Sequence, residues 1–493
     1  MKKMKHGGGQ PVNAKLNEWI VEVDIHTLQK AMEAGEVSSL GLVELYLERI
    51  ELYDHAIHAV LEINPDAKEL ARLLDEERQS QGSRGPLHGI PILLKDNIDT
   101  ADRMHTSAGS VALANSVAAE DAFIVMQLRK AGAVLLGKVN MTEWANFMSA
   151  AMPSGYSSRG GQVWNPYGPG KFDVGGSSAG SGAAVAASFA AAAIGTETSG
   201  SIVNPAHHNS LVGLKPTVGL LSRTGIIPIA HSQDTPGPMT RTVADAAVLL
   251  SALTGTDARD AMSLASEGRG LQDYTSFLDA KGLQGARIGI PRWFYQNLNE
   301  EARLVAENAM KVLREQGADL IDPVSLPCEQ QAAAWNIDVL RYEFKKDLND
   351  YLAKLAASVP VHSLEEVIAF NRAHVDAALV YGQNMLIWSD ETSGTLTETN
   401  YLESLHHYQK FTRAQGIDHV IAEHQLDALL FPCDEGEDIA ARAGYPLLIV
   451  PAGYTAEGPM GVMFAAGAYS EPTLIKLAYA FEQATHYRRP PVL

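Results

Sequence analysis

Short apolar segments that alternate with helical patterns constrain the fold of this chain more than any other feature. Residues 90–94 form a continuous apolar run closed by a polar turn, which predicts a buried strand ending at Lys95. Residues 122–131 are typical of a helix, residues 133–137 of a short strand and residues 142–148 of another helix. This alternation favours an α/β sheet over a helical bundle or a β-sandwich.

The rest of the chain extends the same pattern. The small-residue run at 182–194 predicts a tightly packed central helix. Residues 300–425 are largely helical by pattern, and we expect them to line the substrate pocket. Residues 426–493 indicate strands followed by a helix from about Leu474. Because no internal repeat or clear boundary is visible, we expect one large domain over 24–493, with a central mixed sheet covered by helices on both faces.

The N-terminal 23 residues are basic and contain a glycine tract, which is typical of a flexible tail. They lack the apolar core of a secretory signal peptide. No apolar run in the chain approaches the ~20 residues that cross a bilayer. We therefore expect a cytoplasmic protein without a membrane partner.

Composition and charge exclude several classes of protein. A hydrophobic content of 46% with 20% charged residues is ordinary for a globular domain and argues against disorder. The formal net charge is −19, and a field of that sign repels phosphate backbones, so no nucleic-acid partner is expected. Cys328 and Cys433 are far apart and have no metal-site spacing, which predicts reduced thiols.

Lys95 is the first candidate for chemistry, because it ends a strand that should be buried. Loss of hydration lowers the pKa of a lysine and favours the neutral amine, which can act as a general base. The simpler alternative is a strand-end lysine whose long side chain reaches solvent.

The glycine-rich segment at 174–182 is the second candidate. No Gly-Lys-Ser/Thr follows it, so a phosphate-binding loop is disfavoured. Residues 176–180 fit the G-x-S-x-G pattern of a nucleophile elbow centred on Ser178. That elbow requires a preceding strand, whereas residues 164–174 are rich in Pro and Gly, so a flexible turn is the competing interpretation.

The third candidate is the segment at 195–206, in which we expect a helix to lead into a turn carrying Ser201. Backbone amides of Thr198, Ser199, Gly200 and Ser201 could converge there as an oxyanion hole. Turns of Ser and Gly are also common for purely structural reasons.

Taken in order and spacing, these segments resemble the amidase signature family from about Asp24 onward. Residues 218–239 and 341–353 look most like the bacterial peptide amidase branch. The segments that carry the resemblance are LHGIPILLKDNIDT (87–100), DVGGSSAGSGAAVAA (173–187), GTETSGSIVNPA (195–206), GLKPTVGL (213–220), AGYPLLIVPAGY (443–454) and SEPTLIKLAYAFEQATHYRRPP (470–491).

The resemblance implies a Ser-cisSer-Lys triad within a core at 85–250. Its lysine falls on Lys95, its nucleophile on Ser201 and its bridging serine on Ser177, which replaces Ser178 as the serine of interest. The bond between Gly176 and Ser177 is expected to be cis. The resemblance implies no metal and no organic cofactor.

Several positions depart from the family pattern. Val203 stands where many members have arginine, Ser199 where peptide amidase relatives have aspartate, and Asn204 where they have cysteine. The paired His207 and His208 are also unusual, and a structural role is favoured over a metal site because no third ligand is visible. The stretch at 433–446 is shorter than in the family, which leaves specificity at the site mouth open.

The function implied by the resemblance is hydrolysis of a carboxylic amide through an acyl-enzyme, with C-terminal peptide amides as one substrate class. We expect a small-molecule or peptide amide as partner and a monomer or homodimer. A glutaminase subunit of a tRNA-dependent amidotransferase, and hydrolysis of esters, carbamates or cyclic amides, remain alternatives. A non-catalytic binding protein is disfavoured because all three triad residues are present.

Overall fold

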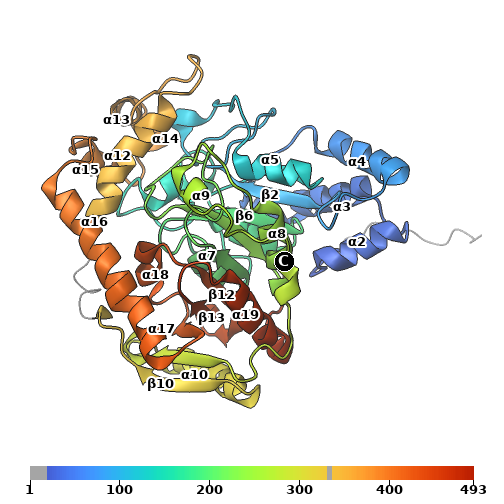
Figure 1. Cartoon of the computed structure of the whole chain (residues 1–493). Coiled ribbons are helices and arrows are strands. Elements are labelled where there is room, and N and C mark those ends of the chain that lie inside the picture. Colours follow the sequence, from blue (N-terminus) through green and yellow to red (C-terminus); the bar gives the residue numbers. More distant parts are fainter. Residues whose placement is uncertain (1–18, 330–335) are drawn as a thin grey trace, which may run out of the picture.

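A large mixed sheet forms the centre of the molecule (Figure 1). The computed structural model describes residues 19–329 and 336–493. The strand order is β1-β3-β2-β6-β8-β7-β12-β13-β11-β9-β10, and a separate hairpin pairs β4 with β5. The strands are β1 (Val60–Ile63), β2 (Pro91–Lys95), β3 (Val134–Val139), β4 (Tyr156–Ser157), β5 (Gly161–Gln162), β6 (Ala192–Glu197), β7 (Val212–Lys215), β8 (Thr235–Thr240), β9 (Arg287–Pro291), β10 (Asp319–Val324), β11 (Ala428–Pro432), β12 (Leu447–Thr455) and β13 (Gly458–Ala465).

Helices cover both faces of the sheet. Successive residues of a strand point to opposite faces, so each strand contributes side chains to two apolar cores. In β2, Ile92 and Leu94 enter one apolar core, whereas Leu93 enters the other. The first core is completed by α2 (Ile25–Glu33), α5 (Phe123–Lys130), α8 (Val243–Leu253), α10 (Glu300–Glu315) and α19 (Glu471–Thr485). The second is completed by α3 (Ser39–Tyr53), α4 (Ala67–Gln81), α6 (Ala179–Ala186), α7 (Val203–His208), α17 (Asp418–His424) and α18 (Glu437–Ala443). The predicted α/β class and mixed sheet are confirmed.

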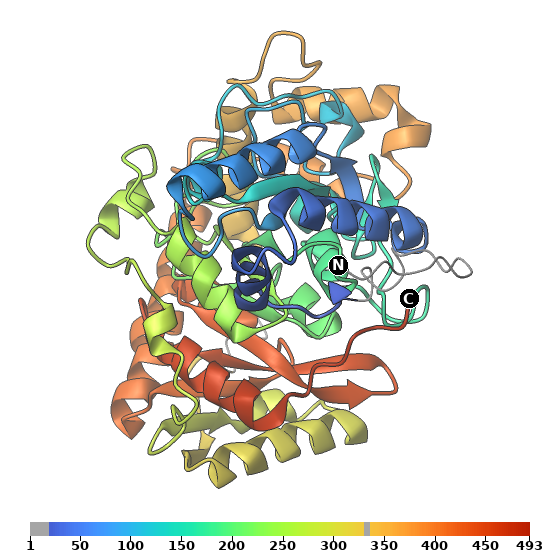
Figure 2. The same ribbon diagram turned by 90° about the vertical axis from the view of Figure 1, so that its right-hand side faces the viewer.

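A third apolar cluster joins a group of helices to the loops at one end of the sheet. Phe344 and Leu348 of α12 pack there with Trp144, Ile227 and Ile229. The group lies at the upper left of Figure 1, whereas Figure 2 shows α10 and α19 side by side at the opposite end of the molecule. The helices of this group are α12 (Asp338–Leu352), α13 (Leu364–Ala373), α14 (Val375–Ala378), α15 (Asn384–Asp390) and α16 (Thr399–Thr412). The short helix α9 (Ala261–Ala265) is not part of the group and follows α8 in the chain.

Several predicted elements are confirmed. β2 ends at Lys95 as expected, and α5 and β3 match the helix and strand predicted after it. The described residues within 300–425 are largely helical, with the strand β10 as an exception. The predicted C-terminal strands are β11, β12 and β13, and the helix that follows begins at Glu471, three residues before the predicted start.

The predicted helix at 142–148 is wrong. Glu143–Asn146 forms only a single 3-10 turn, in which Trp144, Ala145 and Asn146 have φ values of 50°, 55° and 75°. The backbone amides here serve tertiary contacts, since Thr142 donates to the Ser177 carbonyl at 3.0 Å and Trp144 to the Ala108 carbonyl at 3.0 Å. These contacts override the local helical pattern.

The predicted helix at 182–194 is also wrong in its extent. α6 spans Ala179–Ala186, the chain reverses near Ser188 at φ 57°, and β6 begins at Ala192. Alanine favours helix locally. Residues 192–194 nevertheless pair with β2 and residues 193–197 with β8, so sheet pairing outweighs local propensity.

The first described residues contact the C-terminal segment. Most of the predicted tail falls outside the described residues, but Ile20 is buried and Glu22 pairs with Arg488 at 2.7 Å. Within the described ranges, no helix combines the length and apolar character needed to cross a membrane. Both cysteines are unpaired, with Cys328 buried and Cys433 half-buried.

Candidate active site

Lys95 lies at the carboxyl end of β2, between the parallel strands β3 and β6, and is fully buried. Its Nζ donates to the Ser177 hydroxyl at 2.7 Å. It also donates to the Thr196 hydroxyl at 2.9 Å and the Thr196 carbonyl at 3.1 Å. The lysine therefore reaches no solvent and faces a serine, contrary to the alternative in which its side chain extends into water.

Burial lowers the pKa of Lys95 to about 7, against the opposing negative charges of Asp234 and Glu197. An amine with this pKa is substantially neutral near pH 7 and can accept a proton. The end of β2 thus supplies a side chain suited to the role of a base.

Ser177 approaches Lys95 from the glycine-rich segment that precedes α6. The Gly176–Ser177 bond is cis, as the resemblance implies. The Gly176 amide donates to Asn204 Oδ1 at 2.8 Å. A side chain at Gly176 would lie 2.7 Å from the Thr142 hydroxyl, so glycine is needed where the chain passes this close.

Ser201 follows β6 through a tight turn in which Gly200 has φ 79°, and it is only 4% exposed. A strand, not the expected helix, leads into this turn. The Ser178 side chain stabilises this turn, because its hydroxyl donates to the carbonyls of Ser201 at 2.5 Å and Thr196 at 3.1 Å. No strand directly precedes Ser178 in this described region, so the elbow interpretation lacks its structural requirement.

Glu197 is the last residue of β6, and its carboxylate bonds to backbone amides of the turn that follows. Oε2 accepts from the amides of Ile202 at 2.7 Å and Val203 at 3.0 Å, and the carboxylate also faces the Gly200 amide. Burial raises the pKa of Glu197, while the positive charge of Lys215 opposes that rise. The carboxylate fixes the path of the chain through Ser201.

A loop before β8 supports the same turn from the other side. The Thr198 hydroxyl donates to Asp234 Oδ1 at 2.5 Å, and Gln233 Nε2 donates to the Thr198 carbonyl at 3.2 Å. The second oxygen of Asp234 accepts from the amides of Ile229 at 2.8 Å and Ala230 at 2.9 Å. Thr198 is therefore fixed through both its side chain and its backbone.

The stretch at 433–446 contacts the turn with acidic side chains. Ser199 donates to Asp438 Oδ1 at 2.6 Å, and Asn204 donates to Asp434 Oδ2 at 2.6 Å. Two of the departures from the family pattern thus each meet a carboxylate. Val203 is buried in the second apolar core.

His207 and His208 lie on α7 with their rings 4.7 Å apart. Nδ1 of His207 accepts from the Gly461 amide at 3.0 Å, which ties the helix to β13. Burial lowers the pKa of His207 to about 4, so it is a neutral acceptor at pH 7. This is the structural role that the sequence favoured.

A cavity of about 760 Å³ opens beside the turn. It is bordered by Thr196 of β6, by Thr198 of the turn, by the loop at 223–229 and by Tyr351 of α12. Cavities of this size accommodate drug-sized ligands. The helical region thus contributes to the wall of this cavity. That the cavity is the substrate pocket stays a prediction.

Three polar residues of this site escaped the sequence interpretation: Thr196, Glu197 and Asp234. Glu197 carried a usable signal, since it is an acidic residue three positions after the end of the apolar run at 189–194. Buried carboxylates need partners, and here the partners are backbone amides. Thr196 and Asp234 had no comparable signal.

Comparison with known proteins places the chain in a family. A family model described as Amidase matches residues 41–475. A probable amidase of Arabidopsis thaliana is 40% identical, covering 99% of this chain and 95% of that protein. Native peptide amidase from Stenotrophomonas maltophilia superposes with a TM-score of 0.91 and 46% identity, covering 96% of this chain and 99% of that one. A subunit of the Glutamyl-tRNA(Gln) amidotransferase of Chloroflexus aurantiacus is 34% identical, covering 94% of this chain and 97% of that protein.

The family match extends over far more than half of the chain. The relatives also align over nearly their whole lengths, so the similarity is not confined to one motif. The chain belongs to the amidase family and is a hydrolase of carbon–nitrogen bonds.

Proposed function

We propose that the protein cleaves carboxylic amides with Ser201 as nucleophile, Ser177 as proton relay and Lys95 as the base. The observation that carries the proposal is the 2.7 Å contact between Lys95 Nζ and the Ser177 hydroxyl inside a fully buried site. A serine hydroxyl is a weak nucleophile and needs such a base.

In the proposed reaction, the neutral Lys95 amine keeps its two N–H groups on Thr196, and the Ser177 hydroxyl donates to its lone pair. Lys95 then takes the Ser177 proton as Ser177 takes the proton of Ser201. Ser201 Oγ attacks the amide carbonyl, and the developing oxyanion is stabilised by backbone amides within Thr198–Ser201. One donor of this kind contributes about 10²–10³ in rate. The relay returns the proton to the leaving nitrogen, and water then hydrolyses the acyl-enzyme by the same steps.

C-terminal peptide amides are the substrate class that we propose. The support is the 46% identity to a peptide amidase over almost the whole chain, against 34% to the amidotransferase protein. The cavity of about 760 Å³ beside Thr198 has room for the acyl part of a short peptide.

A second candidate is the glutaminase subunit of a tRNA-dependent amidotransferase. The observation in its favour is the alignment with the Chloroflexus aurantiacus protein over 94% of this chain. Stable co-purification with a second subunit, together with glutamine hydrolysis, would favour it. Esters, carbamates and cyclic amides undergo the same acyl chemistry and belong in the substrate panel.

The test measures ammonia or amine release from C-terminal peptide amides, aliphatic and aryl amides, glutamine and carbamates. We expect the peptide amides to be the best substrates and Ser201→Ala to abolish turnover. Ser276→Ala is the matched control, because Ser276 is exposed and its hydroxyl bonds only a local carbonyl in the described contacts. Wild-type turnover in Ser201→Ala would refute the nucleophile assignment.

A further inference from the structure

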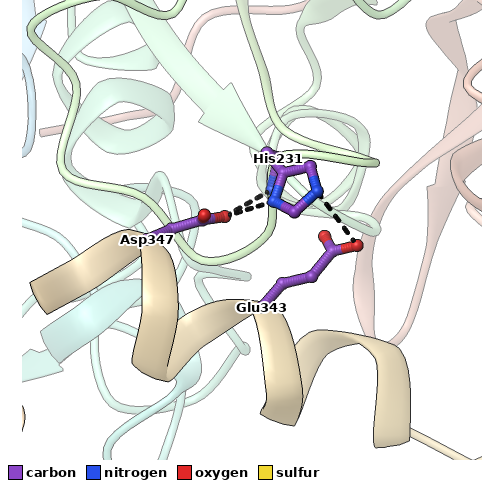
Figure 3. Close-up of side chains that lie close together, drawn as sticks. All are labelled: His231, Glu343 and Asp347. Atoms are coloured by element: carbon purple, nitrogen blue, oxygen red, sulfur yellow. Dashed lines mark hydrogen bonds and ion pairs between the residues drawn. The ribbon is translucent and has the colours of Figure 1, made fainter. Parts of the chain in front are cut away.

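A histidine outside the triad lies between two carboxylates at the edge of the cavity. Figure 3 shows the His231 ring with Asp347 at one ring nitrogen and Glu343 at the other. Nδ1 lies 2.8 Å from Asp347 Oδ2, and Nε2 lies 3.5 Å from Glu343 Oε1. Both carboxylates come from α12, one helical turn apart, so they flank a single ring.

The two carboxylates also hold the backbone of the loop. Asp347 Oδ2 accepts from the His231 amide at 2.9 Å, and Glu343 Oε2 accepts from the Ser232 amide at 3.0 Å. The Tyr401 hydroxyl of α16 donates to Glu343 Oε1 at 2.8 Å and orients it. The loop is therefore attached to α12 at two successive residues.

This attachment lies next to the residues that hold the catalytic turn. Gln233 and Asp234 follow directly and bond the carbonyl and the hydroxyl of Thr198. Thr198 in turn belongs to the proposed oxyanion segment. An unbroken series of contacts thus joins α12 to the turn that carries Ser201.

We propose that His231 is a positioning residue for the hydrolytic reaction, whose imidazolium, bridged by Glu343 and Asp347, fixes the loop that holds Thr198. This inference rests on the proposed function. Only the doubly protonated ring donates from both nitrogens, so loss of one proton leaves a nitrogen lone pair facing a carboxylate. The attachment then weakens and the oxyanion segment loses support.

The charges around the ring favour the protonated form. Burial by itself lowers the pKa of His231, but the bond to Asp347 and the charge of Glu343 raise it above its ordinary value, against the nearby charge of Arg223. Burial raises the pKa of Glu343, and His231 opposes that rise. Because the pKa of His231 is raised, the bridged imidazolium is complete at low pH and is lost as pH rises through that pKa.

A metal ion is the competing occupant, because these three side chains are the one group of potential ligands that the described residues bring within 4.8 Å. The carboxylates, however, face opposite ring nitrogens and do not converge with one nitrogen on a common point (Figure 3). Each carboxylate already accepts a backbone amide. The geometry fits a bridged imidazolium better.

The test compares wild type, His231→Gln and Asp347→Asn from pH 6 to 9.5. The control is His419→Gln, since His419 forms an exposed pair with Glu423 at 3.2 Å on the surface of α17. The readouts are kcat and KM for a peptide amide, and the rate at which phenylmethylsulfonyl fluoride modifies Ser201, located by mass spectrometry. The second readout needs no knowledge of the substrate.

We expect wild-type kcat to fall on the alkaline side. In His231→Gln, kcat should be about tenfold lower at pH 7, with KM little changed and the alkaline fall absent. In Asp347→Asn, the alkaline fall should move down by about one pH unit, because one stabilising charge is gone. His419→Gln should match wild type.

An unchanged alkaline fall in His231→Gln, in both readouts, would overturn the inference while leaving the proposed function intact. Modification of Ser201 without any amide turnover would refute the proposed function alone, and the pH profile of modification would still decide the role of His231. If EDTA or added Zn²⁺ changes the activity of wild type but not of His231→Gln, the cluster is a metal site and the inference fails.

Discussion

The turn that carries Ser201 is held from two sides by contacts of different kinds. On the sheet side, Lys95 and Glu197 are fully buried and contact hydroxyls, carbonyls and amides at the ends of β2 and β6. On the loop side, Thr198 is held by Asp234, and the loop depends on the half-exposed His231. The difference suggests a division of roles: the buried side fixes position and lowers a pKa, whereas the exposed side can respond to pH.

The largest effect is expected from removing the proposed base on the sheet side. Lys95→Met keeps most of the buried volume but has no amine, so kcat for amides should fall by about 10³-fold or more. Circular dichroism and thermal unfolding should show an intact fold, since a similar volume stays buried. A normal kcat in this folded variant would remove Lys95 from the mechanism.

A smaller but still large effect is expected at Glu197. Glu197→Ala leaves the buried amides of Ile202 and Val203 without an acceptor, which should lower the free energy of unfolding by about 3 kcal/mol. We expect kcat to fall by about 10²-fold as the turn loosens. Urea unfolding and steady-state kinetics measure the two effects.

Glu197→Gln is the matched control, because its amide oxygen can accept the same two bonds. Most of the stability lost in Glu197→Ala should return in this variant. Equal losses in both variants would mean that the negative charge, and not the two bonds, holds the turn.

The pH dependence of kcat tests how the loop side influences the sheet side. Because burial lowers the pKa of Lys95 to about 7 and only the neutral amine accepts a proton, kcat should rise about tenfold between pH 6 and pH 8 on its acid side. Asp234 raises that pKa by its charge, so Asp234→Asn should move the rise to lower pH. A rise that stays in place would show that the loop carboxylate does not influence the base.

The sequence predicted the sheet side far better than the loop side. A buried strand ending at Lys95 follows from its apolar run, because local pattern and burial agree there. Ser177 and Ser201 could be assigned only through the family resemblance, since the strongest local motif pointed to Ser178. Resemblance, unlike periodicity, carries information about residues that meet only after folding.

The remaining features depend on contacts between distant parts of the chain. The end of the alanine-rich run forms the strand β6 because it pairs with β2 and β8, although the composition of the run favours helix. His231 meets Glu343 across 112 positions of sequence, 343 minus 231, and nothing in the local pattern of either residue indicates the other. Such pairs are set by how α12 packs on the loop and not by any local signal.

The smallest effect is expected at the junction between the two sides. Thr198→Val keeps the shape of the side chain but removes the hydroxyl that donates to Asp234 at 2.5 Å. One hydrogen bond of this kind contributes about 1 kcal/mol, so kcat should fall by about fivefold with KM nearly constant. Thr198→Ser keeps the hydroxyl and should retain most of the activity. If Thr198→Val instead loses as much activity as Glu197→Ala, the loop is as essential to the turn as the sheet, and the proposed division between a fixed side and a responsive side does not hold.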